Sequence, residues 1–190
     1  MKRAIGFLFT FCISAILWSQ SYEIKFEKVS DSRGKAPGAT FSIVQDDRGV
    51  IWFGTLAGLY KYDGYSFKIY KHEKNNPNSL SANAIRAMCL DKNGNIWIGT
   101  QGGGVNMFNQ QTEEFTRYIH SESDENTIGG SDVWAIDIDH DGRIWAGHWG
   151  QGISVIDPKS GKILRHQHLD GVSGSLSGDI IRSIFVDSKG

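Results

Sequence analysis

Apolar and polar residues follow a pattern that returns at nearly fixed intervals along the chain. Each copy opens with an apolar run that ends at an aspartate, and a short polar turn containing glycine follows. The next run is apolar at successive positions, so we expect a strand that is covered on both faces. The aspartate stands at positions 46, 91, 139 and 187, which are 45, 48 and 48 residues apart. A fixed period of this length indicates a repeat architecture.

The core of the repeat is ten residues long. It reads DDRGVIWFGT over 46–55, DKNGNIWIGT over 91–100 and DHDGRIWAGH over 139–148, and DSKG over 187–190 opens a fourth copy. Aspartate at the first position and glycine at the fourth fit a tight turn, in which the carboxylate accepts backbone N–H groups. We interpret nine recurring residues as structural: Asp46, Gly49, Trp52, Asp91, Gly94, Trp97, Asp139, Gly142 and Trp145.

Four segments with strand character occur in each repeat. The strands before the turn are predicted at 41–44, 85–90, 133–138 and 181–186. The tryptophan strands are predicted at 51–53, 96–98 and 144–146. Alternating segments, typical of half-exposed strands, follow at 58–62, 104–108 and 152–156. Fourth strands are predicted at 67–70, 115–119 and 163–168.

Four consecutive strands in each repeat predict an all-β fold, in which every repeat is a four-stranded antiparallel blade of a β-propeller. The chain holds about three blades and the first strand of a fourth. Closed propellers have roughly 4–8 blades. We therefore expect residues 21–190 to be the N-terminal part of a propeller, incomplete in this chain.

The first 20 residues differ from the repeats. A basic start, Met1 to Arg3, precedes 15 mainly apolar residues from Ala4 to Trp18. This run suits the core of a signal peptide and is shorter than the roughly 18–20 residues that span a bilayer. We predict a signal peptide over 1–20 and export to the periplasm, with an uncleaved membrane anchor as the alternative.

Composition narrows the partners. The 20 basic and 21 acidic residues nearly balance, and no basic cluster occurs, so we expect no nucleic acid partner. Cleavage of the signal peptide would remove Cys12 and leave Cys89 alone, so no internal disulfide is expected. No motif for a cofactor or a catalytic nucleophile is found, and we predict neither a cofactor nor an enzymatic activity for this chain.

Two patterns suggest metal sites, and both are incomplete. DIDHDG over 137–142 matches the opening of a calcium loop, but the twelfth position holds His148 in place of a bidentate glutamate. His166 and His168 share one face of a predicted strand, yet no further ligand is placed to complete a zinc site. We predict no metal site.

The repeats resemble a known family. Beside the ten-residue core, they contain YDGYSF over 62–67 and NPNSLS over 76–81. The combination is similar to the two-component regulator propeller repeats. This resemblance implies the periplasmic sensor region of a hybrid two-component histidine kinase, where two propellers precede a membrane span, a kinase and regulator domains. It also implies that the sensed ligands are carbohydrate breakdown products.

The resemblance therefore implies ligand sensing. We expect a small-molecule ligand of the oligosaccharide type and a signal to a downstream histidine kinase in a parent protein anchored in the inner membrane. Further partners would be the remaining blades, the kinase domains and, in the parent, a second copy in a homodimer. The alternative is a free-standing secreted propeller that acts as a binding scaffold or a lyase-type enzyme.

Differences between the repeats indicate where a ligand could bind. On the strand expected to line the channel, equivalent positions read Arg86, Trp134 and Arg182, and Trp149 follows a core that ends in histidine instead of threonine. These four residues are predicted to form an aromatic and cationic rim that suits a glycan or an acidic sugar. The alternative is that they fill the wedge between blades, because tryptophan is often buried.

Overall fold

The computed structural model describes residues 24–30, 34 and 36–188, and all regular structure in these residues is β-strand. The predicted signal peptide and the last glycine, Gly190, lie outside the described residues. Within the described ranges, no helix is long and apolar enough to cross a membrane.

Twelve strands form three antiparallel sheets of four consecutive strands, one for each repeat. Blade 1 contains β1 (Thr40–Gln45), β2 (Ile51–Thr55), β3 (Gly58–Tyr62) and β4 (Phe67–Tyr70). Blade 2 contains β5 (Ile85–Leu90), β6 (Ile96–Thr100), β7 (Gly104–Asn109) and β8 (Glu114–Tyr118). Blade 3 contains β9 (Val133–Ile138), β10 (Ile144–His148), β11 (Ile153–Ile156) and β12 (Ile163–His166).

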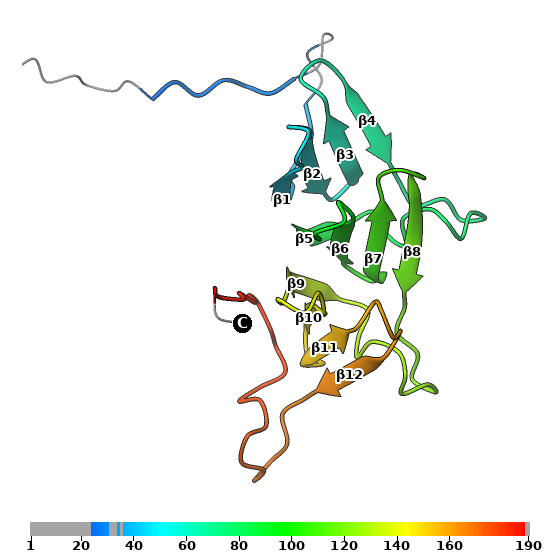
Figure 1. Ribbon diagram of the computed structural model, residues 1–190, viewed down its shortest axis with the longest axis vertical. Helices are drawn as coiled ribbons and strands as arrows, with labels where there is room; N and C mark the ends of the chain where they lie inside the picture. Colours follow the sequence, from blue (N-terminus) through cyan, green and yellow to red (C-terminus); the bar gives the residue numbers. More distant parts are fainter. Residues whose placement is uncertain (1–23, 31–33, 35, 189–190) are drawn as a thin grey trace, which may run out of the picture.

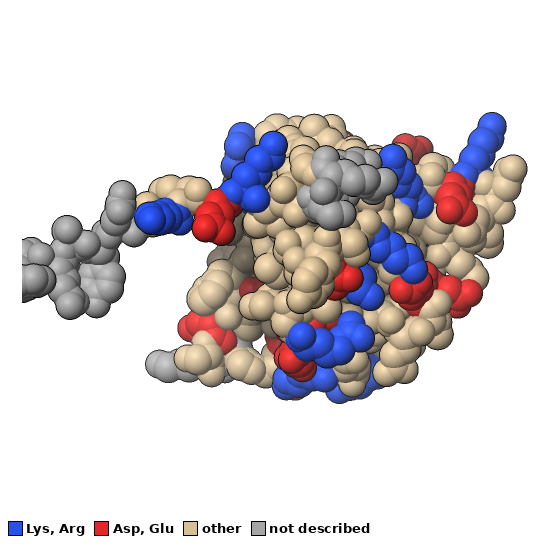
Figure 2. Space-filling view, turned by 90° about the horizontal axis from the view of Figure 1, so that it is seen from above, with Lys and Arg blue, Asp and Glu red and all other residues tan. Residues whose placement is uncertain are grey.

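The three blades lie side by side along the long axis of the molecule, as Figure 1 shows. The first strands β1, β5 and β9 lie on one side, and the last strands β4, β8 and β12 lie on the other. On the end of the molecule seen in Figure 2, basic and acidic side chains are interspersed. The arrangement confirms the prediction of an all-β, incomplete propeller with the first strand of each blade innermost.

The predicted first strand of a fourth blade does not form a regular strand. Ile180 makes an isolated bridge with Trp149, and the Ile181 N–H donates to the His148 carbonyl at 2.9 Å. Residues 181–186 form no ladder, because each first strand of blades 1 to 3 pairs with the second strand of its own blade, and the described residues contain no such strand after residue 186. The prediction of a strand over 181–186 is therefore wrong for this chain, although the segment occupies the expected place.

Two hydrophobic cores lie between consecutive blades and hold them together. The core between blades 1 and 2 joins side chains of both sheets, namely Trp52, Leu59, Ile85, Met88, Ile96, Ile98 and Phe108. The core between blades 2 and 3 is built in the same way from Trp97, Val105, Val133, Ile136, Ile144, Ala146 and Ile156. Trp52 and Trp97 thus contribute to the contact of their blades with the following blade.

The third strands are more buried than their alternating pattern predicted. Four of the six residues of β7 are buried, and Asn106 among them is fully buried. Asn106 Oδ1 accepts the Ser81 N–H at 2.9 Å, and its Nδ2 donates to Ser81 Oγ at 2.7 Å. The polar position faces the loop that enters the blade instead of water, so the prediction of a half-exposed strand is wrong here.

Close approach of the blades depends on the recurring glycine near the end of each core. Gly54 and Gly99 lie against the first residue of the innermost strand of the next blade, and Gly147 lies against Ile181 in the segment after blade 3. A Cβ on these glycines would lie 2.5 to 2.7 Å from a branched side chain, namely Ile85, Val133 and Ile181. Contacts shorter than 3.0 Å force a neighbour to move. Glycine is therefore required for the spacing between blades.

We expect Gly99→Ala to lower the free energy of unfolding by about 1–3 kcal/mol, because overpacking a dense core has this cost. Gly38→Ala is the matched control, since a Cβ at Gly38 meets nothing within 4 Å, and we expect a change within about 0.5 kcal/mol. Urea unfolding of both variants checks the prediction. Equal stabilities would show that glycine does not set the spacing.

Candidate functional site

Each recurring aspartate binds both its own turn and the recurring tryptophan. One carboxylate oxygen accepts two backbone N–H groups of the turn in every blade. The other oxygen accepts the indole N–H at 3.3, 3.1 and 2.9 Å, in the pairs Asp46–Trp52, Asp91–Trp97 and Asp139–Trp145. Burial alone would raise the pKa of Asp46 and Asp139, but these hydrogen bonds, together with those from Arg48 and Arg143, hold it below its usual value.

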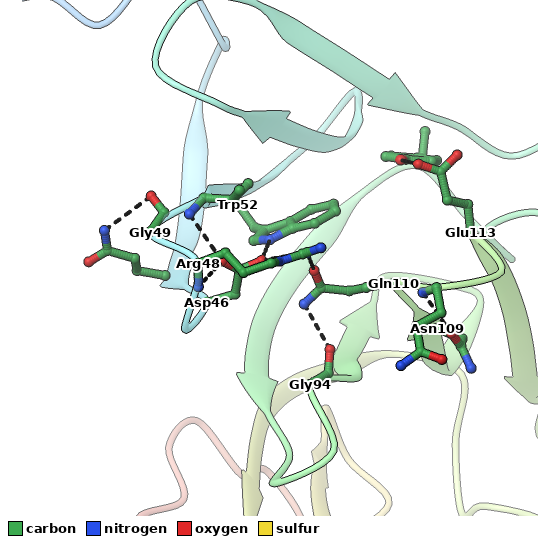
Figure 3. Close-up of polar contacts among 12 residues, drawn as sticks. Asp46, Arg48, Gly49, Trp52, Gly94, Asn109, Gln110 and Glu113 are labelled. Atoms are coloured by element: carbon green, nitrogen blue, oxygen red, sulfur yellow. Dashed lines mark hydrogen bonds and ion pairs between the residues drawn. The ribbon is translucent and has the colours of Figure 1, made fainter.

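Neighbouring turns are also tied to each other. Figure 3 shows Arg48 between the carboxylate of Asp46, at 2.9 Å, and the side chain of Gln110. The Gln110 amide in turn donates to the carbonyl of Gly94, in the turn of blade 2, at 2.7 Å. The polar groups of this face, the turn face, are therefore engaged in holding the scaffold.

The recurring tryptophans differ in how well the chain covers them. Trp52 and Trp97 are 1% and 0% exposed, and the Trp52 ring lies 5.4 Å from the ring of Phe108 in blade 2. Trp145 is only half-buried, because no described blade follows it. It borders cavities of about 440 and 960 Å³ on the open face of blade 3. Since a further blade would pack on this face, we assign no ligand to these cavities.

The four predicted rim residues lie together. The guanidinium of Arg86 lies 4.9 Å from the ring of Trp134, and the rings of Trp134 and Trp149 are stacked at 4.4 Å with an interplanar angle of 27°. The guanidinium of Arg182 lies 4.8 Å from the ring of Trp149. Residues that are far apart in the sequence thus form one continuous stack.

Phe41 extends the stack and was missed in the sequence. Its ring lies 4.6 Å from the Arg86 guanidinium, which therefore contacts aromatic rings of two blades. Phe41 precedes Arg86 by 45 residues, the interval between the first two cores. The period could therefore have identified it. We call Phe41, Arg86, Trp134, Trp149 and Arg182 the rim stack.

A β-bulge in each innermost strand orients the rim side chain of that strand. The register shifts between Thr40 and Ser42 in β1 and between Ile85 and Ala87 in β5, and it shifts opposite Trp134 in β9. The skipped residues are Phe41, Arg86 and Trp134. A bulge leaves one residue out of the ladder and redirects its side chain, so the scaffold itself presents the varying position.

A second position supports the stack, and it also varies between blades. The residues directly after the three cores are Leu56, Gln101 and Trp149. Gln101 Oε1 accepts a hydrogen bond from Arg86 Nη2 at 2.6 Å, and Trp149 stacks on Trp134. Trp149 was predicted from the sequence as a rim residue and Gln101 was not, although the two positions are 48 residues apart, which is the repeat period.

The paired histidines of β12 and the loop after it have structural contacts. The His166 ring stacks on Trp145 at 6.4 Å with an interplanar angle of 7°. His168 belongs to a recurring set, His72, His120 and His168, in which each Nδ1 contacts a carbonyl of the loop to the next blade. Among the residues that the structure describes, no group of three or more His, Cys, Asp or Glu is placed to hold a metal ion.

Comparison with known proteins agrees with the repeat pattern. The family described as "Two component regulator propeller" matches residues 35–57 and 79–102. Residues 35–57 and 79–102, in blades 1 and 2, thus match the two-component regulator propeller repeat. Histidine kinase P4 of Formosa agariphila is 34% identical to it over 74 residues, which are 39% of this chain and 5% of that protein.

Two solved structures that are similar to this chain are extracellular domains of hybrid two-component systems from B. thetaiotaomicron. One is 30% identical with a TM-score of 0.64, over 69% of this chain and 18% of that chain. The other is 27% identical with a TM-score of 0.60, over 80% of this chain and 21% of that chain. The present chain thus spans about a fifth of the length of these domains.

The third propeller repeat accommodates His148 where the others have threonine. His148 is fully buried, and its Nε2 lies 2.7 Å from Ser154 Oγ. In blade 2 the equivalents of Ser154 and Gly129 are the larger residues Asn106 and Ser81. The two smaller residues leave room for the imidazole, so the blade keeps its geometry. Burial, and next the charge of His120, lower the pKa of His148 to about 4.

This buried imidazole predicts an acid-sensitive stability. Because the pKa of His148 is about 4 in the folded protein and about 6.5 when unfolded, the unfolded chain binds the proton first as pH falls. Stability should therefore decrease between about pH 6.5 and pH 4, by roughly 3 kcal/mol in total. Urea unfolding at pH 7 and pH 4.5 measures the loss.

The control is the double variant His148→Thr with Ser154→Asn, which places the blade 2 residues at these two positions of blade 3. We expect this variant to lose less stability on acidification than the unmutated protein, since it has no buried imidazole at position 148 to protonate. The same loss in both proteins would assign the acid sensitivity to other groups.

Proposed function

We propose that residues 21–190 are the N-terminal part of the ligand-sensing propeller of an exported, periplasmic sensor protein, and that the rim stack contacts the ligand. The observation that carries this proposal is the convergence of the rim stack, in which side chains that differ between repeats lie in contact with one another. The similar proteins support sensing, since they are named a histidine kinase and extracellular domains of hybrid two-component systems.

We further propose that the ligand is of the carbohydrate type. Arginine and tryptophan side chains offer the hydrogen-bond donors that sugar oxygens accept. Binding loops that vary on a rigid scaffold are a common arrangement for recognition. On the turn face, by contrast, Arg48, Gln110 and Arg143 are bound to the scaffold.

The signal would pass to a histidine kinase in the parent protein, which we propose to be anchored in the inner membrane. The remaining blades, the kinase domains and a second copy of the parent are the expected partners. The support for this part is the naming of the similar proteins alone, of which this chain covers 5% to 21%.

Calorimetric titration with a panel of oligosaccharides tests the ligand site. We expect Trp134→Ala and Trp149→Ala to weaken binding by about 1–3 kcal/mol, the range for a lost ring contact or charge-assisted hydrogen bond. Lys92→Gln on the turn face is the control, since its ammonium makes only an exposed 3.4 Å contact with the His140 carbonyl. Arg143 is unsuitable as a control, because its Nε donates to Asp139 at 2.6 Å.

Loss of binding in Lys92→Gln, with binding kept in both tryptophan variants, would place the ligand on the turn face and contradict the proposal. If no oligosaccharide of the panel binds the unmutated protein, the carbohydrate assignment is contradicted.

A further inference from the structure

The rings of the rim stack are already covered by one another. Trp134 is contacted by Arg86 at 4.9 Å and by Trp149 at 4.4 Å, and Trp149 is contacted in addition by Arg182 at 4.8 Å. These neighbours compete with a sugar ring for the faces of both indoles. The groups that the two rim tryptophans and the arginines offer directly are the edges of the indole rings and the guanidinium groups.

The edges of the rim tryptophans carry unused donors. The indole N–H of each scaffold tryptophan, Trp52, Trp97 and Trp145, is bound to an aspartate. The indole N–H groups of Trp134 and Trp149 have no hydrogen-bond partner among the described residues, and neither is buried away from solvent. The two classes of tryptophan thus differ in what remains free to bind.

The rim arginines differ from the arginines of the turn face in their charged partners. Arg48 and Arg143 form ion pairs with aspartates of the turns. No described carboxylate forms an ion pair with Arg86 or Arg182. Arg182 is exposed and makes no hydrogen bond to a described residue, while Arg86 uses Nη2 for Gln101 and has a buried Nε without a partner.

The side chains of the rim stack therefore present hydrogen-bond donors and two positive charges. An indole N–H and a guanidinium can only donate, and the nearby acceptor Gln101 Oε1 is occupied by Arg86. The chemical group that fits such a set is an acceptor with negative charge, because charge-assisted bonds to carboxylate or sulfate are the stronger ones. We propose that the rim stack binds an anionic group of the ligand, a carboxylate or a sulfate.

This inference rests on the proposed function, since it takes the rim stack as the place of the ligand. It does not rest on overall charge. The chain has 20 basic and 21 acidic residues, and basic and acidic side chains are interspersed on the end seen in Figure 2. Recognition of an anion would come from Arg86 and Arg182 in a site without a carboxylate partner.

The test is calorimetric titration of the protein with three probes: a uronic acid trisaccharide, its methyl ester, and a trisaccharide whose only charged group is one sulfate. We expect at least one charged probe to bind about tenfold or more tightly than the ester. The advantage should shrink as salt rises from about 0.05 to about 0.5 M, because exposed charges are screened. The preferred probe distinguishes carboxylate from sulfate.

Variants test whether the preference for a charged probe comes from the rim stack. Arg182→Gln should reduce the advantage of the charged probe over the ester about tenfold. Arg182→Lys should keep part of the advantage, since it keeps the charge and loses the planar set of donors. Lys92→Gln removes one positive charge on the turn face and should leave all affinities unchanged.

Equal binding of all three probes, each weakened by Trp149→Ala, would overturn the anionic ligand and leave the proposed function standing. A charged-probe advantage that survives Arg182→Gln and Arg86→Gln would also overturn it. Failure of all three probes to bind would count against the anionic ligand and the carbohydrate site together.

Discussion

The hydrogen bond from the recurring tryptophan to the recurring aspartate fixes the arrangement of every blade. A buried carboxylate must have its oxygens satisfied, and here one oxygen closes the turn while the other holds the indole. The indole is thereby set against the next blade, where Trp97 joins residues of β9 and β10 in one core. Gly99 lets β9 approach closely enough to complete that core. Turn, strand and contact between blades follow from this one pair.

A scaffold that is fixed in this way can vary at positions that it does not need. The bulge residue of each innermost strand lies outside the ladder, so Phe41, Arg86 and Trp134 can differ without loss of a backbone bond. The adjacent blades bring these side chains into contact. Scaffold tryptophans have a bound N–H, whereas the indole N–H groups of Trp134 and Trp149 have no partner among the described residues. The difference gives a chemical criterion for separating structure from recognition in a repeat protein without comparing homologues.

Much of the fold could be predicted from the sequence, because period and turn chemistry act locally. The strands of all three blades and the turns after Asp46, Asp91 and Asp139 lie close to their predicted positions. The bulges could not be predicted, since they depend on pairing with the neighbouring strand. The burial of Asn106 depends on Ser81 in the loop before the blade. His148 required a pair of compensating changes 6 and 19 residues away, at Ser154 and Gly129, which one position cannot reveal.

The division between recurring scaffold and varying rim is tested most directly by comparing two tryptophans in urea unfolding. Trp97 is fully buried and bound to Asp91, whereas Trp149 is half-buried in the rim stack. Trp97→Ala should lower the free energy of unfolding by about 3–5 kcal/mol. Trp149→Ala should lower it by about 1 kcal/mol, the contribution of an aromatic stack near the surface. Losses of equal size at the two positions would contradict the division.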